Sequence, residues 1–388
     1  MPEALSADPI LSLAHPETLP DPFPAYARLR ERPPFFYEPL DSWMFSRHAD
    51  CVAVLRDSAR FAADWRRVGE QVPPQALSML TMDPPEHTAV RRLFLEAMRD
   101  HAGEALERAI AARTEELLSE LARRPSFDVR AELAEPLALS ATCGYLGVPV
   151  PDAASTSRIA GVVGAAMDAG LWPERAEPMG AAYGELAGLV AGWLADPPEH
   201  GVVGDVVRRA AESDVPAPVI ANTVRALFFS GYSSGSKLLA LALVAILHDR
   251  AVGLAELRDA DIVRAVDELV RFAGPVQAVA RACVTDTEVG GTSVRAGQGV
   301  TLLLGAANRD PARFPRPETV LPDRHPNPHL GFGRGPKSCL GSPFMAVFAR
   351  VVLGTLADRH PSVRPLGDPA FLPNLTLRSL DRFEATLR

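Results

Sequence analysis

The segment from Ala217 to His248 is the longest helical candidate in the chain. Apolar side chains occupy nearly all sides of this helix, so we expect it to be buried. Other helical segments are expected at about residues 24–31, 48–56, 102–121, 130–145, 154–168, 175–194 and 265–272. Short strands are expected at residues 42–46 and 276–284, the second of which alternates between two faces. The pattern therefore predicts a mainly helical protein with a smaller β region.

Between these elements the chain contains irregular stretches. We expect residues 1–20 to be irregular because they are rich in proline, and residues 308–328 contain six prolines that exclude a helix or a central strand. Residues 64–82 also lose periodicity, and a long irregular segment inside a compact protein is often a functional loop. We find no repeat, low-complexity linker or charge block, so we predict one domain over residues 1–388.

Composition excludes several classes of function. The hydrophobic fraction of 47% and the charged fraction of 23% are typical of a soluble globular protein. The net charge of −8 argues against nucleic-acid binding. We see neither a signal sequence nor about 18 uninterrupted apolar residues, so we expect a cytoplasmic protein without a membrane anchor. The four cysteines are far apart, which favours neither a disulfide framework nor a zinc site.

One of these cysteines, Cys339, lies in a glycine-rich loop that spans residues 329–341 and precedes an apolar, helix-like run at 344–356. Glycines allow tight turns and a close approach to a flat group, and Pro336 stiffens the turn. The amides of Leu340 and Gly341 are expected to point at the sulfur and favour a thiolate. Such a loop suits a metal with a single protein ligand, for which haem iron is the obvious candidate. The alternative is an ordinary buried core cysteine.

The complete string Phe-Gly-x-Gly-x-x-x-Cys-x-Gly, at residues 332–341, resembles the haem-ligand loop of the cytochromes P450. This resemblance implies the cytochrome P450 fold, mainly α with a smaller β region. It also implies that the chain binds haem b (iron protoporphyrin IX) through the Cys339 thiolate. In the resemblance, Phe332 packs near the sulfur and the porphyrin, and Gly333 and Gly341 belong to the same cofactor-binding loop.

Basic residues elsewhere match other haem contacts of this family. His87 and Arg91 are four residues apart and share one helical face, which by itself is more often a solvated basic surface. The surrounding Asp-Pro-Pro-Glu-His-x-x-x-Arg, however, resembles the P450 helix whose His and Arg bind a haem propionate. Asp83, the first residue of this motif, can cap the helix. By resemblance, Arg281 reaches the second propionate, and Lys337 keeps the positive charge where most bacterial relatives have a histidine.

The centre of the long apolar helix contains an unusual cluster of glycine and serine at residues 229–236. Each mid-helix glycine costs roughly 1 kcal/mol in helix propensity. One interpretation is close packing against a neighbouring helix. The other is a catalytic site, in which Gly231 leaves room for oxygen above the iron and Ser234 offers a hydroxyl. The cluster is similar to the P450 Ala-Gly-x-Asp/Glu-Thr segment, except that Ser233 replaces the acid and Ser234 the threonine.

Glu268 and Arg271 lie on one face of the helix at 265–272. A Glu-x-x-Arg pair alone is no evidence, because many surface helices carry it. The pair precedes Cys339 at the separation that is normal in the P450 family, and Arg324 matches the third member of a buried Glu-Arg-Arg triad. We interpret the triad as scaffold beneath the haem.

The resemblance implies a monooxygenase that uses O2 and inserts one oxygen atom into an apolar small molecule, in bacterial secondary metabolism. Electrons would come from NAD(P)H through a ferredoxin and its reductase, and the protein would act as a monomer. Two alternatives stay open: a P450 that couples phenols or desaturates, since the proton-relay acid is missing, and a non-enzymatic thiolate-haem sensing protein. The substrate does not follow from the sequence. Arg66 and Arg67 could meet a carboxylate, although loop arginines are more often solvated.

Overall fold

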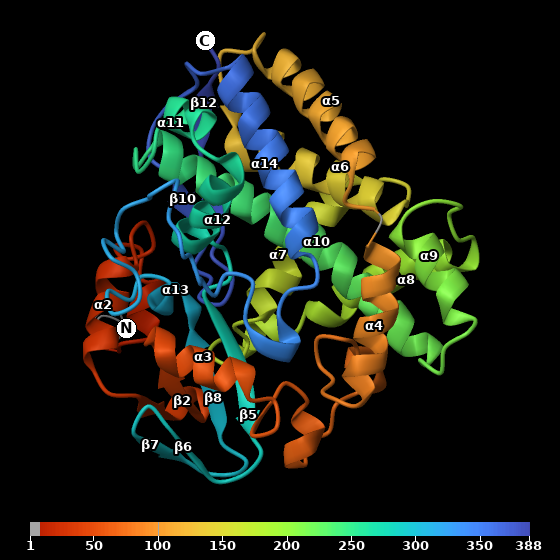
Figure 1. The fold of residues 1–388 in the computed structure, drawn as a ribbon, viewed down its shortest axis with the longest axis vertical. Helices are drawn as coiled ribbons and strands as arrows, with labels where there is room; N and C mark the ends of the chain where they lie inside the picture. Colours follow the sequence, from red (N-terminus) through yellow and green to blue (C-terminus); the bar gives the residue numbers. More distant parts are fainter. Residues whose placement is uncertain (1–7, 100) are drawn as a thin grey trace.

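The helix α10 (Ala217–Leu247) runs through the middle of the molecule, behind α14 (Ser342–Arg359), as Figure 1 shows. The computed structural model describes residues 8–99 and 101–388. The other helices are α2 (Phe23–Glu31), α3 (His48–Arg56), α4 (Glu86–Met98), α5 (Glu104–Leu121), α6 (Glu135–Leu146), α7 (Ala153–Ala166), α8 (Met179–Ala195), α9 (Val202–Ala210), α11 (Leu254–Asp259), α12 (Ile262–Ala273) and α13 (Leu304–Ala307). Single turns of 3-10 helix are η1 (Leu11–Ala14), η2 (Glu38–Leu40), η3 (Trp65–Val68), η4 (Pro74–Ala76), η6 (Pro173–Ala176) and η7 (Gly335–Lys337), and η5 (Val129–Ala134) is a π-helix.

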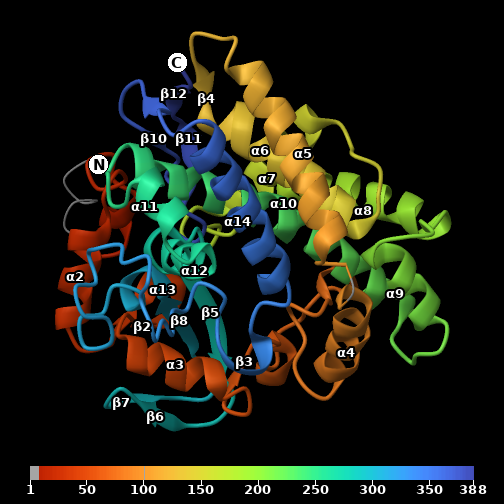
Figure 2. The same cartoon turned by 45° about the horizontal axis from the view of Figure 1, so that its top comes forward.

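The strands form several small sheets. The largest has the order β1 (Phe35–Tyr37), β2 (Ser42–Phe45), β8 (Gly299–Leu303), β5 (Ala278–Cys283), β3 (Phe61–Ala62), with β2 and β8 parallel and the other pairs antiparallel. The smaller sheets are β6 (Thr287–Val289) with β7 (Thr292–Val294), β4 (Phe127–Asp128) with β12 (Glu384–Thr386) and β9 (Arg364–Pro365), and β10 (Ala370–Phe371) with β11 (Leu380–Arg382). Figure 2 shows β5 and β8 close to α12 and α3, below the helical layer. The prediction of a mainly helical fold with a smaller β region is confirmed.

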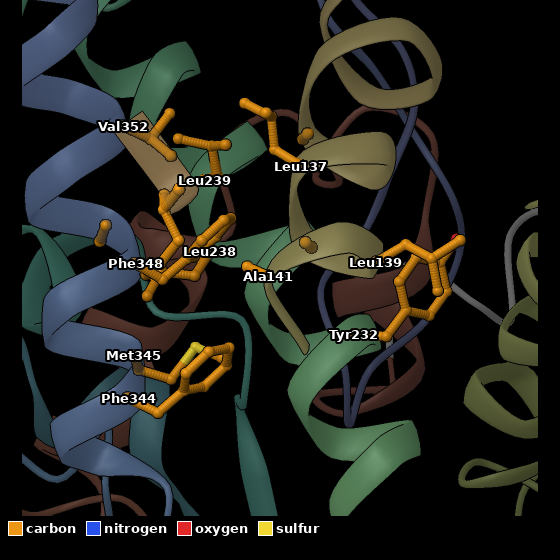
Figure 3. Packing of buried hydrophobic residues seen from close by; sticks show 14 of the residues in the cluster. Leu137, Leu139, Ala141, Tyr232, Leu238, Leu239, Phe344, Met345, Phe348 and Val352 are labelled. Atoms are coloured by element: carbon orange, nitrogen blue, oxygen red, sulfur yellow. The ribbon is translucent and has the colours of Figure 1, made fainter. Parts of the chain in front are cut away.

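The core is built around α10, which packs between α6 and α14 (Figure 3). Leu238 and Leu239 of α10 are buried against apolar side chains of α14. By length and composition alone α10 could cross a membrane, but 78% of its most apolar window is buried inside the molecule. Its apolar composition is therefore explained by a central position in the core.

The two glycines of α10 allow its neighbours to approach closely. A Cβ at Gly231 would lie 2.9 Å from Cγ2 of Thr142 in α6, and one at Gly235 would lie 3.0 Å from Cε of Met345 in α14. Real side chains do not make the first of these contacts without a shift of the helices. The packing interpretation thus accounts for both glycines. The further role of Gly231 above the iron stays a prediction.

Some local details differ from the sequence prediction. The helices α9 and α11 were not predicted, and η1 forms a turn within the segment that was expected to be irregular. Asp83 does not cap α4, whose N-cap is Pro85 without a side-chain hydrogen bond. The Asp83 carboxylate instead accepts hydrogen bonds from the amides of Ala63 and Asp64 at 2.9 and 3.0 Å. The prediction of a cap was wrong because a tertiary contact competes with the local one.

The buried charges expected on α12 form one cluster. Both guanidinium nitrogens of Arg271 that face Glu268 donate to its carboxylate at 2.8 Å, and Arg324 Nε donates to it at 2.9 and 3.0 Å. The Glu268 and Arg271 side chains are fully buried. The arginines also donate to backbone carbonyls of the proline-rich segment, namely those of Asn308, Pro315, Arg316, Pro317 and Thr319. The cluster thereby fastens the irregular chain that leads to Cys339.

Candidate active site

A cavity of about 320 Å³ lies between α10, α4, β5 and the loop that contains Cys339. It brings together the residues that the sequence assigned to the haem site, although they come from distant parts of the chain. The predicted residues that line it are His87, Arg91, Gly231, Ser234, Arg281, Phe332, Gly333, Lys337, Cys339 and Gly341. Ser233 is the predicted site residue that does not line this cavity.

The Cys339 loop is held by its own backbone and by α3. The Cys339 amide donates to the Phe332 carbonyl at 2.8 Å, which closes the loop. Gly335 has a φ of +74°, and a Cβ there would lie 2.5 Å from the Leu55 carbonyl oxygen at the end of α3. Only glycine adopts this backbone conformation without strain in so little space. The loop can therefore sit directly against α3 and turn the cysteine towards the cavity.

Cys339 lies inside the molecule but is accessible from the cavity, whereas Cys51, Cys143 and Cys283 are enclosed in the core. Burial deep in the molecule raises the pKa of the Cys339 thiol, while hydrogen bonds from the Gly341 and Ser342 amides and the charge of Arg91 lower it. The sequence predicted the amides of Leu340 and Gly341, so one of the two donors lies one residue later than expected. These donors favour a thiolate, and a thiolate is the form that binds metal. The alternative of an ordinary buried core cysteine does not describe Cys339.

Four basic side chains converge on one side of the cavity. Arg91 donates to the Ser338 carbonyl at 2.9 Å, Lys337 to the Met79 carbonyl at 2.7 Å, and Arg281 to the Ala280 carbonyl at 2.7 Å. None of these three cations forms an ion pair with a carboxylate within 4.0 Å in the part of the chain that the structure describes. They donate mainly to backbone oxygens, and Asp83 is a nearby carboxylate that favours the charged forms of Lys337 and Arg281, so positive charge exceeds negative charge in the cluster.

The pKa values of these groups reflect the same imbalance. Burial, with the charges of Lys337 and Arg91 as further causes, lowers the pKa of His87 to about 4. Burial lowers the pKa of Lys337 to about 8, although Asp83 opposes this, and Arg281 and Arg91 lower it further. A bound anion would reverse these shifts, because it stabilises the protonated forms. The residues present therefore fit a group that carries carboxylates, as a haem does with its propionates.

We predict that replacing Arg91 or Arg281 with alanine weakens haem retention. Each change removes a charged donor from a buried anion, and such a hydrogen bond contributes roughly 1.5–3 kcal/mol, so haem loss should be about ten-fold or more faster. Transfer of haem to an excess of apomyoglobin measures this rate. Arg108→Ala is a matched control, because Arg108 is exposed on α5 and pairs with Glu104. Unchanged rates in both cavity variants would contradict the propionate assignment.

The rest of the cavity lining is mainly apolar. Its lining includes Met79, Leu80, Leu227, Val276 and Val279, together with the hydroxyl residues Thr223, Ser230 and Ser234 of α10. Met79 and Leu80 belong to the irregular segment at 64–82, so this segment contributes to the pocket. A cavity with an apolar wall and a few hydroxyls suits a small apolar ligand.

Helix α10 holds part of the irregular segment at 64–82 in place. We call residues 74–79 of it the pocket-covering segment. Asn222 Nδ2 donates to the carbonyls of Pro74 and Leu77 at 3.0 and 2.9 Å, and the Met79 amide donates to Thr223 Oγ1 at 3.1 Å. Sequence reasoning did not identify these two residues. Their polar character inside a long apolar run was the available signal, because buried polar groups need partners.

The arginines Arg66 and Arg67 do not line the cavity. Arg66 pairs with Asp64 and Glu86, and Arg67 donates to the carbonyls of Ser58 and Ala59 at 2.6 and 2.8 Å. They stabilise the segment that carries them. The hypothesis that they meet a substrate carboxylate has no support from this arrangement.

The Ser233 hydroxyl points to another neighbour within α10. It accepts a hydrogen bond from Lys237 Nζ at 2.8 Å, and Ser233 is fully buried. Sequence reasoning missed Lys237, although it and Arg225 are the two charged side chains between residues 217 and 247. The sequence therefore contained the signal, since an unpaired charge is rare on a buried helix.

Comparisons with known proteins agree with this geometry. Residues 260–360 match the family model for cytochrome P450. The chain is 33% identical over 352 residues to the mycinamicin IV hydroxylase/epoxidase of Micromonospora griseorubida, with 88% of this chain and 86% of that protein covered. It is 32% identical over 372 residues to the nocardicin C N-oxygenase of Nocardia uniformis subsp. tsuyamanensis, with 91% and 92% covered.

Solved structures give the same result. Ligand-free CYP164A2 of Mycobacterium smegmatis superposes with a TM-score of 0.86 at 30% identity, covering 97% of this chain and 99% of that one. CYP109E1 of Bacillus megaterium, solved with testosterone, shares the fold with a TM-score of 0.88 at 24% identity, covering 96% and 100%. These relatives confirm the predicted family, fold and enzyme class. The chain belongs to the cytochrome P450 family, whose cofactor is a haem iron, and is a P450 monooxygenase of the bacterial type.

Proposed function

We propose that the chain would bind haem b through the Cys339 thiolate and would oxidise an apolar small molecule with one atom of O2. The observation that supports this most strongly is the single cavity that joins the Cys339 thiol, a cluster in which positive charge exceeds negative charge, and an apolar wall. His87, Arg91, Arg281 and Lys337 would hold the propionates. When bound, the haem supplies the oxygen-cleaving chemistry, which an electron-donating thiolate ligand promotes.

The residues of the chain have distinct tasks in this proposal. Phe332, Gly333 and Gly341 shape the space around the sulfur, and the Gly341 amide stabilises its charge. The apolar wall excludes water and orients a C–H bond towards the reacting centre. Ser234, on the cavity face of α10, would order the last hydrogen-bond donor near the oxygen. Gly231 would keep that turn of α10 open.

The remaining parts of the proposal concern partners and location. We propose one P450 domain over residues 1–388 that acts as a monomer in the cytoplasm, receives electrons from NAD(P)H through a ferredoxin and its reductase, and takes a small-molecule substrate. Relatives with names such as hydroxylase, epoxidase and N-oxygenase support oxygen insertion over phenol coupling, desaturation or haem sensing. We expect neither nucleic acid nor a membrane as a partner.

The proposal is tested first by spectroscopy. Reduced protein under carbon monoxide should show the red-shifted Soret band of a thiolate-bound haem, and its absence would end the proposal. A compound library is then screened for changes in the ferric spin state. The best ligand should be oxygenated in the presence of a ferredoxin, its reductase and NAD(P)H. A haem-binding protein without such a product would be a sensor.

A second test concerns Ser234. Ser234→Ala should lower the product formed per NAD(P)H and raise peroxide release, because the hydroxyl that orders the proton donor is lost. Substrate affinity should change little, since one small hydroxyl is removed from a mainly apolar wall. Product, peroxide and NAD(P)H are measured together, and Ser119→Ala on exposed α5 serves as the control. Full coupling in Ser234→Ala would mean that the hydroxyl serves packing.

A further inference from the structure

A second cavity lies on the other side of the Ser233–Lys237 pair. It has a volume of about 50 Å³, and charged and hydroxyl side chains line it together with apolar ones. Its polar lining includes Arg130, Glu135, Ser157, Tyr232, Lys237 and Ser379, which come from η5, α6, α7, α10 and the segment before β11. Lys237 thus lines this second cavity and also reaches the buried Ser233 hydroxyl.

The charges around Lys237 leave its ammonium without a direct partner. Glu135 is paired with Arg130 at 2.7 Å, and Lys237 forms no ion pair within 4.0 Å among the described residues. Burial lowers the pKa of Lys237 from 10.5 to about 8, the charge of Glu135 raises it and that of Arg130 lowers it. Tyr232 also lines this cavity, beside Glu135 and Arg130, and burial raises the pKa of its phenol. The Lys237 ammonium can therefore lose and regain a proton near neutral pH.

Amino-acid usage makes this position unusual. The sequence contains 40 lysines and arginines in total, and only two of them, Lys237 and Lys337, are lysines. An arginine would make the same hydrogen bond to Ser233, but a guanidinium does not deprotonate in proteins. Unlike the arginines of the chain, a lysine at this position can lose its proton, which proton transfer requires.

Residues at helical spacing on α10 lie between the two cavities: Ser230 and Ser234 line the first, and Lys237 lines the second. Ser233 and Lys237 are four residues apart, and Lys237 is three residues after Ser234, so these side chains are neighbours on the helix surface. Ser230 is likewise three residues before Ser233, and both Ser230 and Ser234 line the haem-site cavity. Hydroxyl groups can accept and donate at once, so they can pass a proton along such a row.

We propose that Lys237 is the proton-relaying side chain of this enzyme, in the place of the acid that is missing at Ser233. A proton moves from the ammonium to the Ser233 oxygen, and the original Ser233 proton moves on towards Ser230, one turn earlier on the same face, and from there to water in the haem-site cavity. The neutral amine then takes a proton from a water molecule in the second cavity, which solvent replenishes, so the charge is restored and no electron moves in the relay. This inference rests on the proposed monooxygenase function.

The first test is independent of enzyme activity. Because the chain has two lysines, protein labelled with ¹³C at the lysine ε-carbon should give two side-chain NMR signals, and Lys237→Arg identifies the one from Lys237. We expect this signal to titrate near pH 8. A signal that titrates at the ordinary value of a free lysine would overturn the proposal.

The second test measures how oxygen is reduced without any added substrate. With a ferredoxin and its reductase, NAD(P)H reduces O2 by two electrons to hydrogen peroxide or, when further protons reach the oxygen, by four electrons to water. In the wild type, the peroxide share of consumed NAD(P)H should be low at about pH 6.5 and rise through about pH 8, as the relay loses its proton. A positioned proton donor contributes roughly 10²–10⁴-fold to such a step, so peroxide should become the main product when it is lost.

Three variants separate the relay from a structural role. Lys237→Met removes the ammonium and Ser233→Ala removes the hydroxyl, and both should release mostly peroxide at every pH. Lys237→Arg keeps the charge and the hydrogen bond but cannot titrate, so it should fold normally and still release mostly peroxide. If Lys237→Arg keeps the wild-type share and pH profile, Lys237 is merely structural and the proposal fails. A wild type without the thiolate spectrum or without NAD(P)H oxidation would instead contradict the proposed function.

Discussion

Replacing Cys339 with serine should abolish the thiolate-haem spectrum and all turnover. A serine hydroxyl is a hard, protonated ligand at neutral pH and is a poor substitute for a thiolate on iron. The fold should survive, because the loop closes through the backbone bond from the Cys339 amide to the Phe332 carbonyl, which serine keeps. Absorbance of the reduced protein under carbon monoxide and haem content per chain measure the effect, and circular dichroism reports the fold.

The matched control for this change is Cys283→Ser. Cys283 is buried in β5, and its thiol donates to the Thr285 carbonyl at 3.1 Å, a contact that a hydroxyl can also make. This variant should keep the thiolate spectrum and its haem. Turnover that persists in Cys339→Ser would mean that another residue ligates the iron, and the assignment of the axial ligand would then be wrong.

Replacing Glu268 with glutamine should strongly destabilise the protein. The change keeps the size of the side chain but leaves the buried guanidinium groups of Arg271 and Arg324 without a negative charge. Breaking a buried ion pair by removing one partner costs roughly 3–5 kcal/mol. Because the arginines hold the chain that leads to Cys339, the haem content should fall together with the unfolding temperature. Thermal unfolding and absorbance measure both effects.

Glu104→Gln provides the contrast. Glu104 pairs with Arg108 on the surface of α5, where both side chains are mostly exposed. A surface pair of this kind contributes about 0–1 kcal/mol, so its loss should leave stability and haem content nearly unchanged. If Glu268→Gln behaved like Glu104→Gln, the cluster would not be the fastening that its hydrogen bonds indicate.

Much of this site could be predicted because its information is local. Phe332 to Gly341 lie within one loop, and His87 and Arg91 lie one helical turn apart on the same face of a helix. Their motifs and their resemblance to a known family were therefore enough to predict that they line the same cavity. The long helix was equally clear, since apolar residues on all sides indicate burial. The packing role of its glycines was weighed correctly as one of two interpretations, because Thr142 and Met345 occupy the space in question.

What could not be predicted depends on contacts between distant segments. Asp83 satisfies the amides of Ala63 and Asp64, and this competition with capping is invisible in a local pattern. The direction of the Ser233 hydroxyl follows from its hydrogen bond with Lys237, whose long side chain reaches back one turn of the helix. Helical periodicity gives the angle of a residue on the helix, but the partner decides the direction of its hydroxyl.

The hydrogen bonds that Asn222 donates to the pocket-covering segment, and the one that Thr223 accepts from it, define a unit for grafting. Residues 74–79 are attached to the first half of α10 through backbone groups, so their own side chains are free to vary without loss of this attachment. A loop transplanted from a relative to change substrate range must therefore offer carbonyls and an amide in register with Asn222 and Thr223. Exchanging the loop together with these two residues keeps the hydrogen bonds between the loop and α10. The turn that contains Ser233 and Ser234 lies farther along the helix and is not changed.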